Sequence, residues 1–543
     1  MPVVTFDYTD FINLLGYKIN KKALLEKLPM IGADLDRVED DEISIEFFPD
    51  RPDLASVEGI VRACRTFFDF ENNIKKYPIK KSDIQIVVDP SVKKVRPYVV
   101  TALVKNVNMS DELISSLMDL QEKLHMGIGR NRKKLAIGVH NFEPVEPPFT
   151  YKAVDPNAVQ FVPLNKIESM TMSQILEKHE KGVDYAHLLK DFDKHPLIVD
   201  KNNNVLSYPP IINGSLTEVT PFTKDLFIDV TGNDFKAVNY ALNIVTSALA
   251  ERGGEIYSTT VVDNNKKIIT PNFEFRKKDL NVDYVNKILG TQIDEEKVSS
   301  CLIKMGYEIV QKNNKKITVG IPPWRADILH EIDLIEDVAK GYGYEEFDID
   351  FPVALTIAKK LDIQELLNAI KTTMIGLGFN EVTTFTISNE KDEFEKLGLK
   401  AQKCVKIKNP IAEEYSCLRV GLISSLLKIL NENRHHSLPQ QIFEIGITVD
   451  KENNNQYMLG FLKIDAKANF TECKSLTEAV MRELNIKYAL DDYSHPAFIK
   501  GRCAMIKHDG KEIGFFGELH PQTISNFNLE YPIIAFQIKL IEK

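Results

Sequence analysis

The most distinctive stretch of the chain is Pro322-Pro323-Trp324-Arg325-Ala326-Asp327, which leads into Asp333-Leu334-Ile335-Glu336-Asp337-Val338-Ala339. The second part predicts a helix, because apolar residues recur on one face at three- and four-residue spacing. The residues of this predicted buried face are Ile328, Ile332 and Ile335. We therefore expect a helix that begins shortly after Trp324 and packs one side against a core.

The same predicted helix carries three acidic residues on another face. Asp333, Glu336 and Asp337 occupy positions i, i+3 and i+4, so their carboxylates project together and could hold a hard cation. Asp327 lies six residues earlier and suits an N-cap, so it reaches the same ion only if the first turn bends. From the spacing alone, a solvated acidic face with a cap is the favoured interpretation.

Outward from this helix, residues 268–345 predict a small helical unit. Short helices are expected at 283–289 and 294–305, and a β pair is expected to turn at Asn313-Asn314. Two helices beside a wing are typical of winged-helix modules. The second of these helices begins with acidic residues, so we do not expect it to bind a nucleic-acid groove directly.

With 543 residues, the chain is too long for one hydrophobic core, and an α+β multidomain protein is expected. Helical periodicity is clearest at 111–126 and 235–252, and a further helix is expected to open at Pro52. The patterns predict an N-terminal α+β domain (1–80), a large mixed α+β domain (83–265), the small helical unit (268–345) and an antiparallel sheet with flanking helices (355–543).

Composition narrows the classes of protein that remain. Hydrophobic residues make up 43% of the chain and charged residues 27%, which is typical of globular proteins. The net charge of −10 argues against a generally basic nucleic-acid-binding surface. The six cysteines are scattered singly, and no apolar run approaches the roughly 20 residues that cross a bilayer. We expect a soluble, cytoplasmic protein without a membrane segment.

Four stretches, in order along the chain, resemble the β subunits of heteromeric phenylalanyl-tRNA synthetases of the archaeal and eukaryotic type. The first is Pro49-Asp50-Arg51-Pro52-Asp53, with Asp50 where asparagine is commoner in the family, and the third is the stretch around Trp324. The second pairs Gly127–Lys134 with Pro209–Asn213 and Asp229–Gly232. The fourth includes Gly376–Val382, Phe443–Gly446 and Gly517–Pro521. Together they cover nearly the whole chain.

The resemblance implies a magnesium ion in a site shared with a catalytic α subunit. Its ligands in this chain would be Asp327, Asp333, Glu336 and Asp337, with Asp337 replacing the commoner glutamate. Magnesium is commonly held by few carboxylates plus waters, so the shorter acid is acceptable.

The resemblance also implies an editing site in the domain at 83–265, which hydrolyses tyrosine wrongly attached to tRNA(Phe). A pocket for phenylalanine rejects an added hydroxyl by only about 10², so a second, hydrolytic site is physically expected. The candidate residues are Asp229, Thr231, Ser207 and Asn213. For each single residue, a strand ending in a turn is an equally good interpretation. A positioned water is the expected nucleophile.

A basic segment after two glycines is a candidate for contact with tRNA phosphates. Its residues are Arg130, Arg132, Lys133 and Lys134. An ordinary basic surface loop is the alternative, and it is slightly favoured.

The last domain resembles a class II synthetase core that lacks catalytic residues. An active core needs a phenylalanine-arginine pair for ATP, whereas Phe443 is followed here by Glu444, and the late stretch Gly514–Glu518 has no arginine. The implied assembly is an (αβ)₂ heterotetramer that attaches phenylalanine to tRNA(Phe) with ATP, in which this chain acts as scaffold, tRNA-binding and editing subunit. A free-standing deacylase and a non-catalytic RNA-binding scaffold remain as alternatives.

Overall fold

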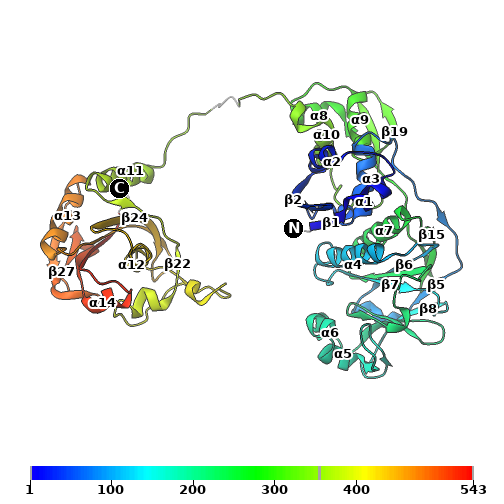
Figure 1. The fold of residues 1–543 in the computed structure, drawn as a ribbon, viewed down its shortest axis with the longest axis horizontal. Coiled ribbons are helices and arrows are strands. Elements are labelled where there is room, and N and C mark those ends of the chain that lie inside the picture. Colours follow the sequence, from blue (N-terminus) through cyan, green and yellow to red (C-terminus); the bar gives the residue numbers. More distant parts are fainter. Residues whose placement is uncertain (1–2, 352–355, 541–543) are drawn as a thin grey trace. The chain divides into compact units, whose positions relative to one another are not determined.

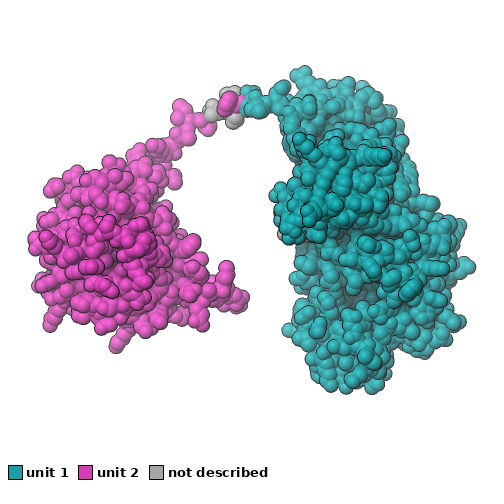
Figure 2. Space-filling model, in the orientation of Figure 1, with its two compact units in different colours: residues 1–350 teal, residues 351–543 magenta. Residues whose placement is uncertain are grey.

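The computed structural model describes residues 3–351 and 356–540, which divide into two compact units, Met1–Asp350 and Phe351–Lys543 (Figures 1 and 2). The predicted limits at residues 1, 355 and 543 lie outside the described residues. Both units mix helices with sheets, so the α+β multidomain prediction is confirmed at this level.

The chain begins with a three-stranded antiparallel sheet in the order β1-β3-β2, covered by helices. The predicted helix at Pro52 is corrected: Pro52–Leu54 forms one 3₁₀ turn, and α3 starts at Val57 because the Ser56 side chain accepts a hydrogen bond from the Gly59 amide. The elements are β1 (Val3–Asp7), α1 (Tyr8–Leu15), α2 (Lys21–Lys27), β2 (Ala33–Glu39), β3 (Glu42–Phe47) and α3 (Val57–Phe67).

The middle of the first unit contains two sheets. A five-stranded sheet has the order β4-β15-β6-β14-β7, and a seven-stranded sheet has the order β13-β12-β11-β8-β5-β16-β17. Helices α4 and α7 pack on one face of the five-stranded sheet and bury a large apolar core there (Figure 1).

The two long helices of this middle part agree closely with the predicted ones: α4 has the predicted bounds, and α7 ends one residue earlier than predicted. The five-stranded sheet and its helices are β4 (Ile79–Lys80), β6 (Tyr98–Lys105), α4 (Asp111–Met126), β7 (Leu135–Asn141), β14 (Leu226–Gly232), α7 (Phe235–Glu251) and β15 (Glu255–Tyr257). The seven-stranded sheet and the helices that follow its strands are β5 (Gln85–Val88), β8 (Phe149–Val154), α5 (Met172–Lys178), α6 (Glu180–Tyr185), β11 (His195–Val199), β12 (Val205–Tyr208), β13 (Ile212–Asn213), β16 (Thr259–Asp263) and β17 (Lys266–Thr270). A short pair, β9 (Gln160–Phe161) and β10 (Met170–Thr171), stands apart.

The end of the first unit is a three-stranded sheet, in the order β18-β20-β19, with three helices. The expected boundary at 265/268 falls within β17, which pairs with β16 and so belongs to the preceding sheet. The elements are β18 (Arg276–Asn281), α8 (Val282–Leu289), α9 (Glu295–Lys304), β19 (Glu308–Asn313), β20 (Lys316–Ile321) and α10 (Glu331–Tyr342). On α10 the expected core face is correct for Ile335, which is buried, but Ile332 is exposed.

The second unit is built on a seven-stranded sheet in the order β21-β24-β25-β29-β28-β27-β26, in which every pairing is antiparallel except that of β21 with β24. Helices α11 and α13 cover one face and α12 lies against the other. The elements are α11 (Asp362–Gly376), β21 (Asn380–Glu381), β22 (Ile387–Ser388), β23 (Cys417–Leu418), α12 (Ile423–Glu432), β24 (Gln440–Val449), β25 (Asn455–Ile464), α13 (Phe470–Glu483), β26 (Ala489–Asp492), β27 (Phe498–His508), β28 (Lys511–Leu519), α14 (Pro521–Asn526) and β29 (Ile533–Lys539).

Buried charges join the segments of the first unit. Arg65 on α3 donates to the Glu251 carboxylate at the end of α7 over 2.6 Å, and Tyr77 donates to the same carboxylate. Beside them, the Arg62 guanidinium lies 4.3 Å from the ring centroid of Trp324, which also meets Tyr77 edge to face. Helix α3 of the N-terminal part, helix α7 of the middle part and the stretch around Trp324 therefore meet in one buried joint.

Replacement of Glu251 by glutamine should destabilise the first unit by about 3–5 kcal/mol, because Arg65 is left buried without its opposite charge. Trp324 is the only tryptophan of the chain and is 3% exposed next to this joint. Chemical unfolding followed by tryptophan fluorescence therefore reports on the first unit alone. Glu255→Gln removes a surface ion pair with Lys80 and keeps an amide oxygen that can still accept from Asn106 and Tyr257, so it serves as the matched control and should leave the transition nearly unchanged. If Glu251→Gln and Glu255→Gln unfold at the same denaturant concentration, the result would contradict the claim that Glu251 stabilises this joint.

The stabilisation that the Arg65–Glu251 pair gives to the first unit should disappear in acid. Burial alone would raise the pKa of Glu251, but the charge of Arg65 holds it below its usual value. The stabilisation is therefore present above the unfolded-state pKa of about 4.3 and is lost as the pH falls through the lower folded-state pKa.

Candidate functional site

The middle part of the first unit contains a cavity of about 280 Å³. Its walls come from α4, the ends of β7 and β14, the loop around His179 and the segment 207–213. All four residues predicted for the editing site line it, so the structure brings them together: Ser207, Asn213, Asp229 and Thr231. The apolar part of the wall includes Met118, Ala136, Ile137, Tyr208, Ile211 and Ile212.

Asp229 and Thr231 lie on β14, the strand between β6 and β7. Successive side chains of a strand point to opposite faces, so residues two apart share a face. Ile228 and Val230 belong to the core under α4 and α7, which places Asp229 and Thr231 on the opposite face, toward the cavity. Each is at most 1% exposed.

Ser207 and Asn213 face each other across the short β12–β13 pair. The Ser207 hydroxyl donates to the Asn213 amide oxygen over 3.4 Å, and the Asn213 amide donates to the carbonyl of Val139. These contacts connect the segment 207–213 to β7 of the other sheet. The cavity is thus closed by elements of both sheets.

Two buried basic residues that the sequence did not single out lie behind Asp229 and Thr231. The Asp229 carboxylate is 2.9 Å from His140 Nε2, and both side chains are buried. Arg96 donates from Nε to the Thr231 hydroxyl over 3.0 Å and from Nη2 to the Thr231 carbonyl over 2.9 Å. Their sequence neighbourhoods give no sign of this role, because both contacts join residues about 90 or more positions apart.

The basic segment divides into buried and exposed residues. Arg132 is buried, donates to the carbonyls of Pro210 and Ile211 and pairs with Glu122 over 2.6 Å, so its guanidinium holds the cavity wall. The prediction that Arg132 is free to contact RNA is therefore corrected. Arg130 and Lys133 are exposed, and Lys134 is half-buried and pairs with Asp234.

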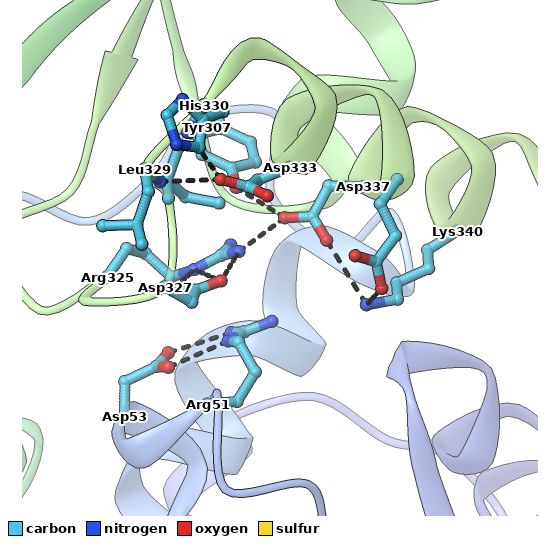
Figure 3. A network of polar contacts seen from close by, with 12 residues as sticks. Arg51, Asp53, Tyr307, Arg325, Asp327, Leu329, His330, Asp333, Asp337 and Lys340 are labelled. Atoms are coloured by element: carbon cyan, nitrogen blue, oxygen red, sulfur yellow. Dashed lines mark hydrogen bonds and ion pairs between the residues drawn. The ribbon is translucent and has the colours of Figure 1, made fainter. Parts of the chain in front are cut away.

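The four predicted magnesium ligands lie on or near α10, but their carboxylates bind other groups of the protein instead of a metal ion (Figure 3). Arg325 Nη2 lies 2.6 Å from both Asp327 Oδ2 and Asp337 Oδ2, and the Tyr307 hydroxyl donates to Asp337 over 2.5 Å. Burial would raise the pKa of Asp337, but the charge of Arg325 holds it below its usual value.

The other two carboxylates serve the helix itself. Asp333 Oδ2 accepts hydrogen bonds from the backbone amides of Leu329 and His330 (Figure 3). The exposed side chain of Glu336 pairs with Lys340 over 2.8 Å. Within residues 3–351 and 356–540, no three His, Cys, Asp or Glu side chains gather as a metal site. The donor set therefore does not fit a bound magnesium in this conformation.

The first and third family stretches lie beside each other in this network. Arg51 forms two 2.9 Å hydrogen bonds to Asp53, and both side chains are buried. Burial and the charge of Arg325 would lower the pKa of Arg51, but Asp53 and Asp327 hold it above its usual value. Figure 3 shows the two ion pairs one above the other. The charged residues of these two family stretches thus form a structural ion network.

In the second unit the position expected for an ATP-binding arginine carries Glu444. Its carboxylate is buried and lies 2.9 Å from Arg419, which is 2% exposed. Two residues of the unit's own chain therefore neutralise each other on this face of the sheet. None of the described helices is long and apolar enough to cross a membrane.

Comparison with known proteins agrees with this architecture. Residues 350–540 match the family model described as the phenylalanyl tRNA synthetase beta chain CLM domain, and residues 278–344 match the tRNA synthetase B5 domain. The chain is 44% identical to the phenylalanine–tRNA ligase beta subunits of Methanosarcina acetivorans and of Archaeoglobus fulgidus, over 99% of this chain and 98% of each relative. A solved N-terminal fragment of the phenylalanyl-tRNA synthetase beta subunit from Pyrococcus horikoshii superposes with a TM-score of 0.61 at 36% identity, and the match covers 63% of this chain and 99% of the fragment.

The fold and these matches define a subunit of an aminoacyl-tRNA synthetase. More narrowly, the chain belongs to the family of phenylalanine–tRNA ligase beta subunits. A beta subunit implies an alpha-subunit partner.

Removal of divalent metal should leave the isolated chain unchanged. Because Arg325, Lys340 and backbone amides already hold the four carboxylates, the unfolding transition seen through Trp324 should be the same in EDTA and in excess magnesium chloride. Saturable stabilisation by magnesium that Asp337→Asn abolishes would contradict this account of α10.

Proposed function

We propose that this ligase beta subunit hydrolyses tyrosyl-tRNA(Phe) in the cavity lined by Asp229 and Thr231, while its alpha partner uses ATP to attach phenylalanine. The observation that carries the proposal is the pair of buried polar side chains on one face of β14, in a cavity whose wall also has an apolar part. An apolar wall suits an aromatic ring, and the polar pair suits its hydroxyl group.

A water molecule is the proposed nucleophile. The Ser207 hydroxyl donates to the Asn213 amide oxygen rather than to a general base, so it lacks the activation that a serine nucleophile needs. Ser207 and Asn213 are proposed to position the ester or the water at the edge of the cavity, where they connect the two sheets.

The second unit is proposed to contact the catalytic partner in an (αβ)₂ heterotetramer rather than to activate phenylalanine. The Arg419–Glu444 pair supports this, because the position expected for the ATP-binding arginine carries a carboxylate, and the nearby guanidinium of Arg419 is already neutralised by it. A magnesium ion shared with the partner would have to use Asp333 and Glu336, the two predicted ligands on α10 that are not buried. We propose that the assembly acts in the cytoplasm.

Asp229→Asn should lower tyrosyl-tRNA(Phe) hydrolysis by the chain co-expressed with its alpha partner by roughly 100-fold, because the pocket loses its buried negative acceptor. Phenylalanine attachment should be unchanged. Asp193→Asn removes an exposed acid from the same domain and is the matched control.

Three outcomes separate the alternatives. Unchanged hydrolysis by Asp229→Asn would refute this site and favour the RNA-binding scaffold. Efficient hydrolysis by the lone chain would favour a free-standing deacylase. Activation of phenylalanine by the lone chain would show that the second unit is catalytic.

Exposed Arg130 and Lys133 are proposed to contact phosphates of tRNA(Phe) near the cavity. Replacement of either by glutamine should weaken tRNA binding and lower the salt slope of log K by about 1, as expected for one lost phosphate contact. Arg132→Gln should instead destabilise the first unit, because its guanidinium holds two buried carbonyls. Lys22→Gln, on the exposed face of α2, is the control. Salt slopes identical to wild type for both Arg130→Gln and Lys133→Gln would contradict the contact.

A further inference from the structure

The two polar residues at the base of the cavity are held from behind by buried groups with different hydrogen-bonding properties. His140 lies behind Asp229, and Arg96 lies behind Thr231. Their side chains are at most 3% exposed. The hydrogen-bonding group that His140 leaves free on Asp229, and the one that Arg96 leaves free on Thr231, decide which ligand the cavity can bind.

Arg96 leaves Thr231 as a hydrogen-bond donor. A hydroxyl has one proton to donate and two lone pairs to accept with, and Arg96 can only donate. Since Arg96 Nε already donates to the Thr231 oxygen, the Thr231 proton is left to point into the cavity. Burial lowers the pKa of Arg96 to about 10, so the guanidinium is still charged at neutral pH. Its Nη1 also donates to the Arg132 carbonyl over 3.2 Å, which fixes its orientation.

His140 leaves Asp229 as an acceptor. His140 Nδ1 lies 2.8 Å from the Thr217 hydroxyl, which can give its proton to Nδ1 or to the Gly214 carbonyl 3.3 Å away. Whether the ring is neutral or charged, Nε2 can therefore carry a proton and donate it to Asp229 Oδ2. The second carboxylate oxygen, Oδ1, is left to accept from a ligand.

Gly138 makes this arrangement possible. It is paired with Asp229 across β7 and β14, and a Cβ atom added there would overlap both Asp229 Oδ2 and His140 Nε2. Gly138 also lines the cavity, so the missing side chain opens the approach to Asp229.

We propose that His140 and Arg96 are positioning residues that present Asp229 as an acceptor and Thr231 as a donor, two residues apart on one strand. This pair is complementary to a phenolic hydroxyl, which donates one hydrogen bond and accepts another. Phenylalanine would leave both groups buried and unpaired. A site built in this way rejects the ligand that lacks the hydroxyl by roughly 10⁴-fold or more. The inference rests on the proposed editing function and names what makes it selective for tyrosine.

The test compares kcat/KM for hydrolysis of tyrosyl-tRNA(Phe) with that of phenylalanyl-tRNA(Phe) by the complex with the alpha partner. His140→Leu and Arg96→Met remove the two rear contacts and should each lower the tyrosine-to-phenylalanine ratio at least about 10-fold, through the tyrosyl substrate. His140→Gln and Arg96→Lys, which can still donate, should recover most of the ratio. Phenylalanine attachment and Trp324 fluorescence report whether each variant is folded.

A merely structural role predicts a different result, in which both substrates lose activity together and the ratio stays constant. That result, or an unchanged ratio in folded His140→Leu, would overturn the proposal. If His140→Leu does not assemble, Thr217→Val leaves His140 in place and removes the hydroxyl that contacts Nδ1 and the Gly214 carbonyl, so it should lower the ratio by a smaller factor. A ratio equal to wild type in that variant would overturn the role of His140. Failure of the editing function is distinguished by Asp229→Asn, which would then hydrolyse tyrosyl-tRNA(Phe) like the wild type.

Discussion

The pairing of β14 with β6 and β7 along its whole length is the constraint on which the middle of the first unit depends. With a neighbour on both sides, the strand has one register, and its alternation assigns every second side chain to a face. Ile228 and Val230 pack under α7 and α4, so Asp229 and Thr231 must lie on the other face. A one-residue slip would bury the carboxylate in the apolar core and expose valine to the cavity. The position of the candidate site thus follows from the same hydrogen bonds that stabilise the sheet.

Buried charges give the first unit its second constraint. Glu251 accepts from Arg65 and Tyr77, and Arg325 binds Asp327 and Asp337, so each buried carboxylate has a basic partner inside the protein. Such pairs contribute less to net stability than apolar packing of equal volume, but removal of one partner is costly. They therefore fix how the segments meet. The acids of α10, for which the family resemblance implies a metal site, are better explained in this conformation as part of that fixed joint.

Much of the fold could be predicted from local patterns. Helix α4 has the expected bounds because Ser110 caps it and leucines recur at helical spacing up to Gly127. Asp229 and Thr231 could be selected because the family resemblance places the editing site in this domain and both are polar residues at the end of an expected strand. The role of Arg132 could not be predicted, because three consecutive residues with positive φ, Arg130 to Arg132, turn its side chain inward from a segment that has the composition of a surface loop. Likewise, His140 and Arg96 acquire their roles only through strand pairing and long-range contacts, and β17 joins the earlier sheet by pairing with β16 across a short turn.

The central claim is that the cavity recognises the hydroxyl group of tyrosine at the end of tRNA. The most direct measurement is a structure of the complex with its alpha partner, bound to an analogue of the tRNA end in which tyrosine is joined to adenosine through an amide that is not hydrolysed. The account predicts the tyrosine ring in the cavity, with its hydroxyl within hydrogen-bond distance of Asp229 and Thr231, and no such occupancy by the phenylalanine analogue. Tyrosine bound elsewhere, or equal occupancy by the two analogues, would contradict it.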